Sequence, residues 1–411
     1  MLATAGLVAI GMAATIWWGP MLEGRTAWTL PHDLWGTMAG ASRLLHLNLA
    51  GLYMQPTRLV TFPGGAVILV PIVAVIEAAG LSLQVPGAQL PQPGAWLLAG
   101  PYVIVLSAVA LFAADAIAER MGVTRPKRAL LAAASAVALW SVSVRWGHPE
   151  DAVAVGLLLY GIMALSGSRV GRSAWLVGAA VAVQPLVLLA LPIVLVVIEP
   201  RRLAGYLARA AAPGVVVLGA AALANWQATY DAVTSQPNYP TVNHPTAWAS
   251  FAPHLANDTV AAGPGRVAAI LAACACALVA ARRLRAARHD TWGPETFGEV
   301  LWWVAVALAL RSVFEPVMVA YYLWPVLAVA LIAAASSWPH LVATSLTVAT
   351  LTGVSQIPWR SPWTWWAPMI AGLALTLLFA RVPAPRAATS VAGAAAGPAP
   401  SQGGRGARFT G

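Results

Sequence analysis

Charge is the scarcest property of this 411-residue chain: only 9% of its residues are charged, and only 14 are acidic. A soluble domain carries about 25% charged residues, whereas 59% of this chain is hydrophobic and its mean hydropathy is +0.73. This balance argues against a soluble enzyme, a disordered protein or a nucleic-acid binder. The net charge of +10 comes from short basic clusters between long apolar runs, which is typical of loops beside an anionic membrane surface. We predict a multi-pass membrane protein.

Cysteine is almost as rare. Cys274 and Cys276 lie in one apolar run, too close for an ordinary disulfide and without His or Asp neighbours for a metal site. We interpret both as lipid-facing or helix-facing residues. Residues 1–18 lack a basic segment and a small-residue cleavage site, so we expect a first spanning helix there rather than a signal peptide.

Crossing a bilayer takes about 20 apolar residues. The candidate segments are 1–18, 63–82, 97–119, 129–146, 152–167, 174–198, 210–225, 265–281, 297–313, 318–337, 339–356 and 366–381. If all twelve crossed, with the N-terminus in the cytoplasm, the basic residues would divide evenly between the two sides, against the positive-inside rule.

Two of these segments are interrupted. Pro63-Gly64-Gly65 opens segment 63–82, and Gln184-Pro185 breaks segment 174–198. If both segments enter and return on the same side, ten crossings remain and most basic residues lie inside, which we prefer. Broken helices are tolerated at membrane depth where they line a cavity, so this arrangement also predicts a cavity.

The predicted fold is therefore an all-α polytopic bundle of 10–12 transmembrane or re-entrant helices. One membrane domain covers residues 1–381, with outer loops at 19–62, 226–264 and 355–365. Residues 382–411 are rich in Ala, Gly, Pro and Ser, and we expect them to form a disordered cytoplasmic tail.

His32 and Asp33 precede a segment, 36–53, in which apolar residues recur at helical spacing. This pattern predicts an amphipathic helix on the outer membrane surface. Asp33 stands at its start, where a carboxylate commonly caps the helix. A carboxylate beside a histidine is also what a general base needs, and both interpretations stay open.

A second polar group lies in the turn 145–151, which holds Arg145, His148, Glu150 and Asp151. Proline at 149 starts a helix, and the two acids then occupy its first turn, where the helix dipole favours them. That accounts for the acids but not for the arginine and histidine beside them. Such a cluster at the mouth of a charge-poor bundle is also typical of a functional site.

A third group combines Arg311 and Glu315 with Tyr321 and Tyr322. The first two are four residues apart and could form a helical ion pair, and the tyrosines could belong to an interfacial aromatic belt, as we expect for Trp365 and its neighbours. Alternatively, Arg311 binds a phosphate and the tyrosines contact a sugar.

The outer loop 230–264 is rich in Pro, Asn, His and aromatic residues and almost uncharged. His244 and Trp248 could contact a carbohydrate. A rigid, extended lid without ligand contacts is the alternative.

Together these features resemble the GT-C superfamily of integral-membrane glycosyltransferases. Within it the chain is similar to glycosyltransferase family 87, the polyprenol-phosphate-mannose-dependent mannosyltransferases. The matching motifs are Asp33-Leu34-Trp35, Leu52-Tyr53, Phe62-Pro63-Gly64, Val70-Pro71, Gln184-Pro185-Leu186 with Pro192, and Tyr321-Tyr322. The chain departs from the family pattern at Gln184, where lysine is usual, and at Pro63-Gly64, where Pro-Pro is usual. The turn 148–151 is not a general family motif.

The resemblance implies a GT-C-like fold and transfer of a sugar, with mannose expected, from a polyprenyl-phosphate donor to a cell-envelope glycolipid or glycan, with inversion. It makes Asp33 the general base, on the outer face of the plasma membrane. We assign the donor phosphate and sugar to His32, Arg58, Arg145, His148, Glu150, Asp151, Arg311, Glu315, Tyr321 and Tyr322, and the acceptor to His244 and Trp248. The outer loops contain no Asp-x-Asp motif, so we expect no metal and no cofactor besides the lipid-linked donor. The alternatives are a transporter or flippase of lipid-linked sugars and a non-catalytic membrane scaffold.

Overall fold

The computed structural model describes residues 28–54, 59, 61–81, 83, 91–234, 236–286, 292–358 and 361–383, and the single positions 6, 9, 11 and 13. Most of the predicted first span, Arg58, and residues 384–411 of the predicted tail lie outside this described part of the chain.

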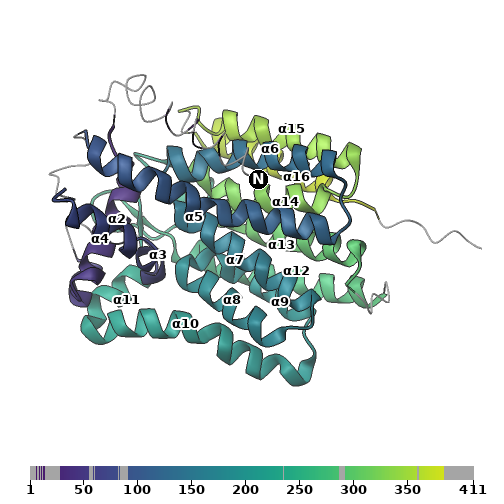
Figure 1. The fold of residues 1–411 in the computed structure, drawn as a ribbon, viewed down its shortest axis with the longest axis horizontal. Helices are drawn as coiled ribbons and strands as arrows, with labels where there is room; N and C mark the ends of the chain where they lie inside the picture. The colour runs from purple at the N-terminus through teal and green to yellow at the C-terminus, as the bar shows by residue number, and fades with distance from the viewer. Residues whose placement is uncertain are drawn as a thin grey trace, which may run out of the picture.

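Within the described ranges, seven helical segments are long and apolar enough to cross a membrane. They are α5 (Pro93–Arg120), α6 (Arg125–Trp140) with η2 (Ser141–Arg145), α7 (Pro149–Ser166), η4 (Pro200–Arg202) with α10 (Leu203–Ala224), α12 (Gly263–Ala286), α13 (Pro294–Phe314), and η7 (Pro362–Trp366) with α16 (Ala367–Ala380). Proline begins α5, α7 and α13, at a position where its missing N–H has no helical partner to lose. The protein is an all-α polytopic membrane protein whose long helices pack side by side (Figure 1).

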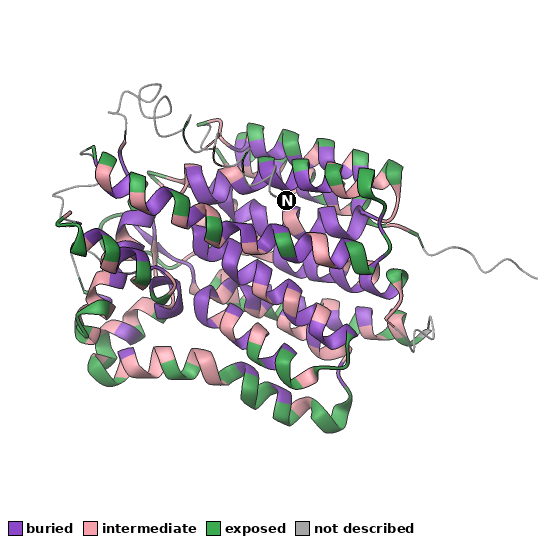
Figure 2. Ribbon diagram, viewed as in Figure 1, coloured by how far each residue is buried: buried purple, intermediate pink, exposed green. Residues whose placement is uncertain are grey.

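The centre of the bundle holds α14 (Trp324–Ala334), which follows η6 (Ala320–Leu323), and α15 (Trp338–Val354) lies beside it. All residues of α14 except Ala328 are buried. In contrast, α10 exposes Val215, Val216 and Leu223 at the periphery (Figure 2). A helix that is apolar all round is either buried in protein or faces lipid, and this bundle contains both kinds.

Segment 174–198 is interrupted at Gln184, as its sequence predicts. α8 (Val170–Val183) ends before Gln184, and η3 (Pro185–Leu189) and α9 (Leu191–Val196) follow. Ser173 bonds to Tyr206, and Gly178 packs on Ala210, so α8 and α10 run in the same direction. The chain therefore turns back at Gln184 and returns to the end of the bundle where α8 began.

Short helices cover the opposite end of the bundle: α2 (His32–Leu45), η1 (Leu49–Gly51), α3 (Pro63–Val67), α4 (Val70–Ala78) and α11 (Trp226–Thr234) (Figure 1). With five and nine residues, α3 and α4 are too short to cross a membrane, so neither half of segment 63–82 is a span. The predicted amphipathic helix is present as α2 but ends at Leu45. Its apolar residues Leu34 and Met38 are fully buried, and the helix packs against α3 and α4. Periodicity predicted the apolar face correctly but not that protein, rather than lipid, covers it.

The loop after α11 forms two small antiparallel ladders and one helical turn. β1 (Pro237–Asn238) pairs with β3 (Val260–Ala261), β2 (His244–Pro245) pairs with β4 (Val317–Met318), and η5 (Ala249–Phe251) lies between them in sequence. The second ladder ties this loop to the chain between α13 and α14.

Basic residues mark the other end. Arg120 at the end of α5 donates to the Ser166 carbonyl at the end of α7, and Lys127 donates to the Ser336 carbonyl between α14 and α15. Arg381, after α16, lies over the ring of Trp302 in α13. We call this the basic end, and the end covered by the short helices the capped end.

Candidate functional site

The site is built around Asp33 at the capped end. α2 starts at His32 after Pro31, and the Asp33 side chain makes no capping bond to the helix amides. It accepts a hydrogen bond at Oδ2 from Nε2 of His148, 2.9 Å away. The interpretation of Asp33 as a helix cap is therefore wrong, because its carboxylate is directed across to another helix.

The turn between α6 and α7 positions His148. A π-helical segment, η2, ends α6, and Gly147 adopts a φ of 73° that favours glycine. A Cβ at this position would lie 2.7 Å from Cβ of Leu34. The absence of a side chain at Gly147 thus allows the turn to approach α2 closely enough for the His148–Asp33 contact.

Both ring nitrogens of His148 have carboxylate partners. Nδ1 lies 2.7 Å from Oε1 of Glu150, which is only 1% exposed. One face of the imidazole stacks on Tyr321, with ring centroids 3.9 Å apart. As predicted, Glu150 and Asp151 lie in the first turn of α7. The ring is therefore fixed in position and orientation.

The charges of this group follow from its contacts. Burial favours a lower pKa for His148, but the charge of Glu150 and the hydrogen bonds to Asp33 and Glu150 raise that pKa well above 6.5. Burial favours a higher pKa for Asp33, but the bonds from His148 and His32 hold that pKa well below its usual range. At neutral pH His148 is thus protonated, and its ring lies between the side chains of Asp33 and Glu150.

Asp33 is the accessible member of the group. Its side chain is 34% exposed, against 4% for His148. His32, which is mostly exposed, lies with Nδ1 3.6 Å from Oδ1 of Asp33, and the hydrogen bond to Asp33 raises the pKa of His32. A hydroxyl group from outside can therefore reach the carboxylate without entering the bundle.

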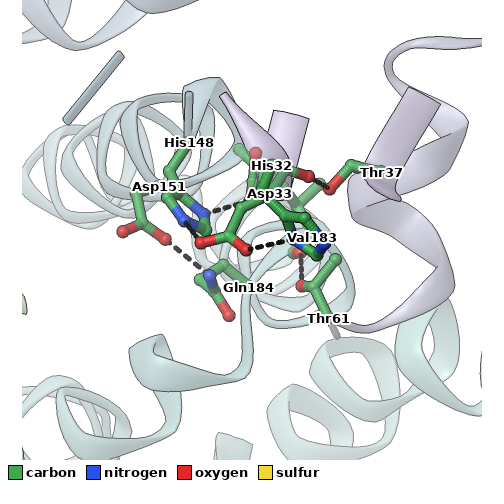
Figure 3. A network of polar contacts seen from close by, with 9 residues as sticks. His32, Asp33, Thr37, Thr61, His148, Asp151, Val183 and Gln184 are labelled. Carbon is green, nitrogen blue, oxygen red and sulfur yellow. Dashed lines mark hydrogen bonds and ion pairs between the residues drawn. The ribbon is translucent and has the colours of Figure 1, made fainter. Parts of the chain in front are cut away.

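Gln184, at the turn between α8 and η3, also belongs to the site. Its amide nitrogen donates to Oδ1 of Asp151 at 2.5 Å, beside the Asp33–His148 contact (Figure 3). Thr61 donates to the carbonyl of Val183, and a Cβ at Gly64 would overlap the carbonyl oxygen of Ala182. The glycine-containing start of α3 therefore holds this turn in place. Gln184 is not among the site residues predicted from the sequence, although the break at Gln184-Pro185 is visible there.

Two arginines lie over aromatic rings that neighbour the group. Cζ of Arg311 lies 3.6 Å from the ring centroid of Tyr322, and Cζ of Arg145 lies 6.0 Å from that of Trp146. Tyr321 and Tyr322 are both buried, so the alternative that they form an aromatic belt is wrong, and they contact site residues instead.

Glu315 does not pair with Arg311. α13 ends at Phe314, so Glu315 leaves the helix and the geometry of a pair four residues apart is lost. Its carboxylate bonds instead to Arg266, 2.9 Å away, and Arg266 also donates to Gln236.

The two predicted acceptor residues hold the outer loop against the bundle. His244 stacks on Trp365 with ring centroids 3.8 Å apart, and the Trp248 indole donates to the carbonyl of Val313. Trp365 is 1% exposed, which contradicts its expected place in an aromatic belt. Trp248 remains 40% exposed.

The structure thus brings together His32, Asp33, His148 and Glu150 in direct contact, with Asp151 and Gln184 beside them. Arg58 lies outside the described residues. Across the described part of the chain, no group of three or more His, Cys, Asp or Glu side chains could hold a metal ion. The arrangement offers a carboxylate that can accept a proton, next to a buried cation.

No protein-family model and no curated protein matches this sequence.

Proposed function

We propose that this protein is an integral-membrane glycosyltransferase with a GT-C-like fold. It transfers a sugar, with mannose expected, from a polyprenyl-phosphate donor to a cell-envelope glycolipid or glycan. The observation that supports this most is the contact between the partly exposed Asp33 and the buried His148, which Glu150 holds from its other side. The chain has only 14 acidic residues, and two of them contact one buried histidine. Burying such ionisable groups costs free energy, and clusters of this kind are typical of functional sites.

The proposed reaction is a single displacement. The acceptor oxygen forms a bond to the anomeric carbon, the bond from that carbon to the phosphate oxygen breaks, and polyprenyl phosphate leaves with the electron pair. Asp33 takes the proton of the attacking hydroxyl, and attack from the face opposite the phosphate inverts the configuration. A weakly basic carboxylate suffices, because the hydroxyl becomes acidic as its oxygen bonds to a carbon with oxocarbenium character.

The leaving phosphate needs positive charge. His148 is protonated at neutral pH. Arg145 and Arg311 lie over the rings of Trp146 and Tyr322, and both rings contact Tyr321, which stacks on His148. Fixed cations of this kind stabilise a departing phosphate in a water-poor site. They supply the stabilisation in this proposal.

The distribution of charge supports an outer site. Arg120, Lys127 and Arg381 belong to the basic end, which the positive-inside rule places in the cytoplasm. The capped end then faces outward from the plasma membrane. Donor and acceptor would meet there.

Asp33→Asn tests the proposal. We expect transfer to fall by about 10²–10⁴-fold, the usual contribution of a general base, together with some loss of thermal stability, because His148 loses one of its two carboxylate partners. The measurement is transfer of label from radiolabelled polyprenyl-phosphate-mannose to an envelope glycolipid extract. Asp258→Asn is the matched control, because Asp258 is exposed and its φ of 54° suits asparagine.

One observation favours a second function, a flippase of lipid-linked sugars: the hairpin of α8, η3 and α9 is a broken-helix element of the kind that transporters use. Flipping of a labelled polyprenyl-phosphate sugar in proteoliposomes without acceptor would support it. Acceptor-dependent transfer without flipping would exclude it.

A further inference from the structure

Three charged side chains near His148 each contain a buried polar atom that has no hydrogen-bond partner among the described residues. These atoms are Oε2 of Glu150, Oδ2 of Asp151 and Nη1 of Arg311. Leaving such an atom without a partner costs about 1–3 kcal/mol or more. Native proteins rarely retain several of them together unless a ligand or water completes the bonds.

The free oxygen of Asp151 has a fixed direction. Gln184 holds the other oxygen at 2.5 Å, and Thr61 ties the neighbouring backbone at Val183. Figure 3 shows the amide of Gln184 directed at Asp151, beside the Asp33–His148 contact. Asp151 is fully buried, and its charge interacts with that of Arg311. The side chain of Asp151 is therefore held in one orientation without a ligand.

Charge decides which part of a donor fits. Two of the three free atoms belong to the acids Glu150 and Asp151, and one belongs to Arg311, so acidic groups predominate at this position. Asp151 and Glu150 would repel a phosphate placed against their free oxygens. A neutral hydroxyl donates one hydrogen bond to a carboxylate and accepts one from a guanidinium, so two hydroxyl groups of a sugar can satisfy all three free atoms.

We infer that Asp151, positioned by Gln184 and assisted by Arg311, binds hydroxyl groups of the donor sugar. This inference rests on the proposed function and reassigns Arg311 from the phosphate to the sugar. The sugar ring then lies toward the turn at Gln184, and the phosphate lies toward Arg145. Asp151 and Gln184 determine sugar specificity, and Asp33 remains the base.

The test compares two soluble lipids, farnesyl-phosphate mannose and farnesyl phosphate, by calorimetric binding to the purified full-length chain. We expect the wild type to bind the sugar-bearing lipid more tightly. Asp151→Asn should reduce this preference about tenfold, the worth of one hydrogen bond to a charged group, without changing the affinity for farnesyl phosphate. Gln184→Met should act in the same direction, and Arg145→Gln should weaken both lipids equally.

Unchanged farnesyl phosphate affinity also shows that a variant is folded, and Gln184→Met decides the matter if Asp151→Asn does not fold. If the wild type transfers mannose but both variants keep the full sugar preference, the sugar site is wrong and the proposed function stands. If the wild type binds neither lipid and transfers nothing, the proposed function fails and this inference fails with it.

Discussion

The two ends of the bundle use charged residues in different ways. At the basic end, Arg128 forms two bonds of 2.7 Å to Asp115, and Arg201 pairs with Glu199 near solvent. At the capped end, His148 lies buried between two carboxylates, and neighbouring charged atoms have no partner among the described residues. Paired charges near solvent contribute to the orientation of the protein in the membrane and modestly to its stability. Buried charges with unsatisfied hydrogen bonds lower the stability of the fold, and they are typical of functional sites.

Among the changes that compare the two ends, replacing His148 should have the largest effect on transfer. His148→Gln keeps a hydrogen-bond donor near Asp33 but removes the charge, and we expect transfer to fall about 100-fold, at the low end of acid–base effects. The measurement is the rate of mannose transfer as a function of pH.

The dependence of the transfer rate on pH should follow the titration of His148 and Asp33. The pKa of His148 is raised above 6.5, so its ion pairs stabilise the fold fully below that pH and are lost as pH rises through the folded-state pKa. The pKa of Asp33 is lowered, so wild-type transfer should be flat on the acid side and fall on the alkaline side. In His148→Gln the alkaline decline should vanish and an acid decline should appear at a higher pH than in the wild type, because Asp33 loses one of the two histidines that lower its pKa. An unchanged profile would contradict the role of His148.

The glycines of the two ends offer a matched pair. Gly147 and Gly122 have φ values of 73° and 72°, so alanine is strained at both by about 1–2 kcal/mol. At Gly147 the new Cβ also meets Leu34, whereas at Gly122 nothing lies within 4 Å. We expect Gly147→Ala to lower transfer by up to about 100-fold, because displacement of a reacting group by about 1 Å has that effect.

Gly122→Ala should destabilise the protein without affecting transfer. Thermal unfolding and transfer, measured on both variants, separate the two effects. Equal transfer in both variants would show that the close approach of Gly147 to α2 does not position Asp33.

Glu150→Gln should have a smaller effect. It keeps an acceptor for Nδ1 of His148 but removes the charge that raises the pKa of His148. We expect transfer at neutral pH to fall about tenfold, equivalent to 1.4 kcal/mol, and the alkaline decline to move to lower pH. A fall in transfer without a shift of the profile would assign Glu150 a purely structural role.

The smallest effect is expected at the basic end. Asp115→Asn removes the paired carboxylate of Arg128, and we expect a loss of about 1 kcal/mol or less, as for partly exposed ion pairs, with transfer unchanged. Chemical denaturation and the transfer assay check both parts. A tenfold loss of transfer would remove the distinction between the two ends.

Much of this arrangement was predictable from local sequence. Pro149 and Pro185 predicted the start of α7 and the break at Gln184. The effect of proline on the backbone depends on few neighbours, so it can be predicted from local sequence. Because the chain has few charged residues, Asp33 and the turn at His148 could be predicted as site residues. Ionisable residues in a charge-poor membrane protein are typical of functional sites.

Long-range contacts were not predictable in this way. The pairing of Asp151 with Gln184 joins residues 33 positions apart, and no local pattern specifies it. The alternative in which Glu315 pairs with Arg311 required helical spacing past Phe314, where α13 ends. The apolar face of α2 was assigned to lipid because hydrophobic periodicity does not identify what covers it.

The proposed function requires Asp33 to lie on the outer side of the membrane, and the accessibility of introduced cysteines tests this most directly. In a background without Cys274 and Cys276, single cysteines at His32 and at Arg172, both exposed, report on the capped and the basic end. We expect a membrane-impermeant thiol reagent to label His32→Cys on intact cells, and Arg172→Cys only after permeabilisation. Labelling of Arg172→Cys alone on intact cells would place Asp33 in the cytoplasm and contradict the account.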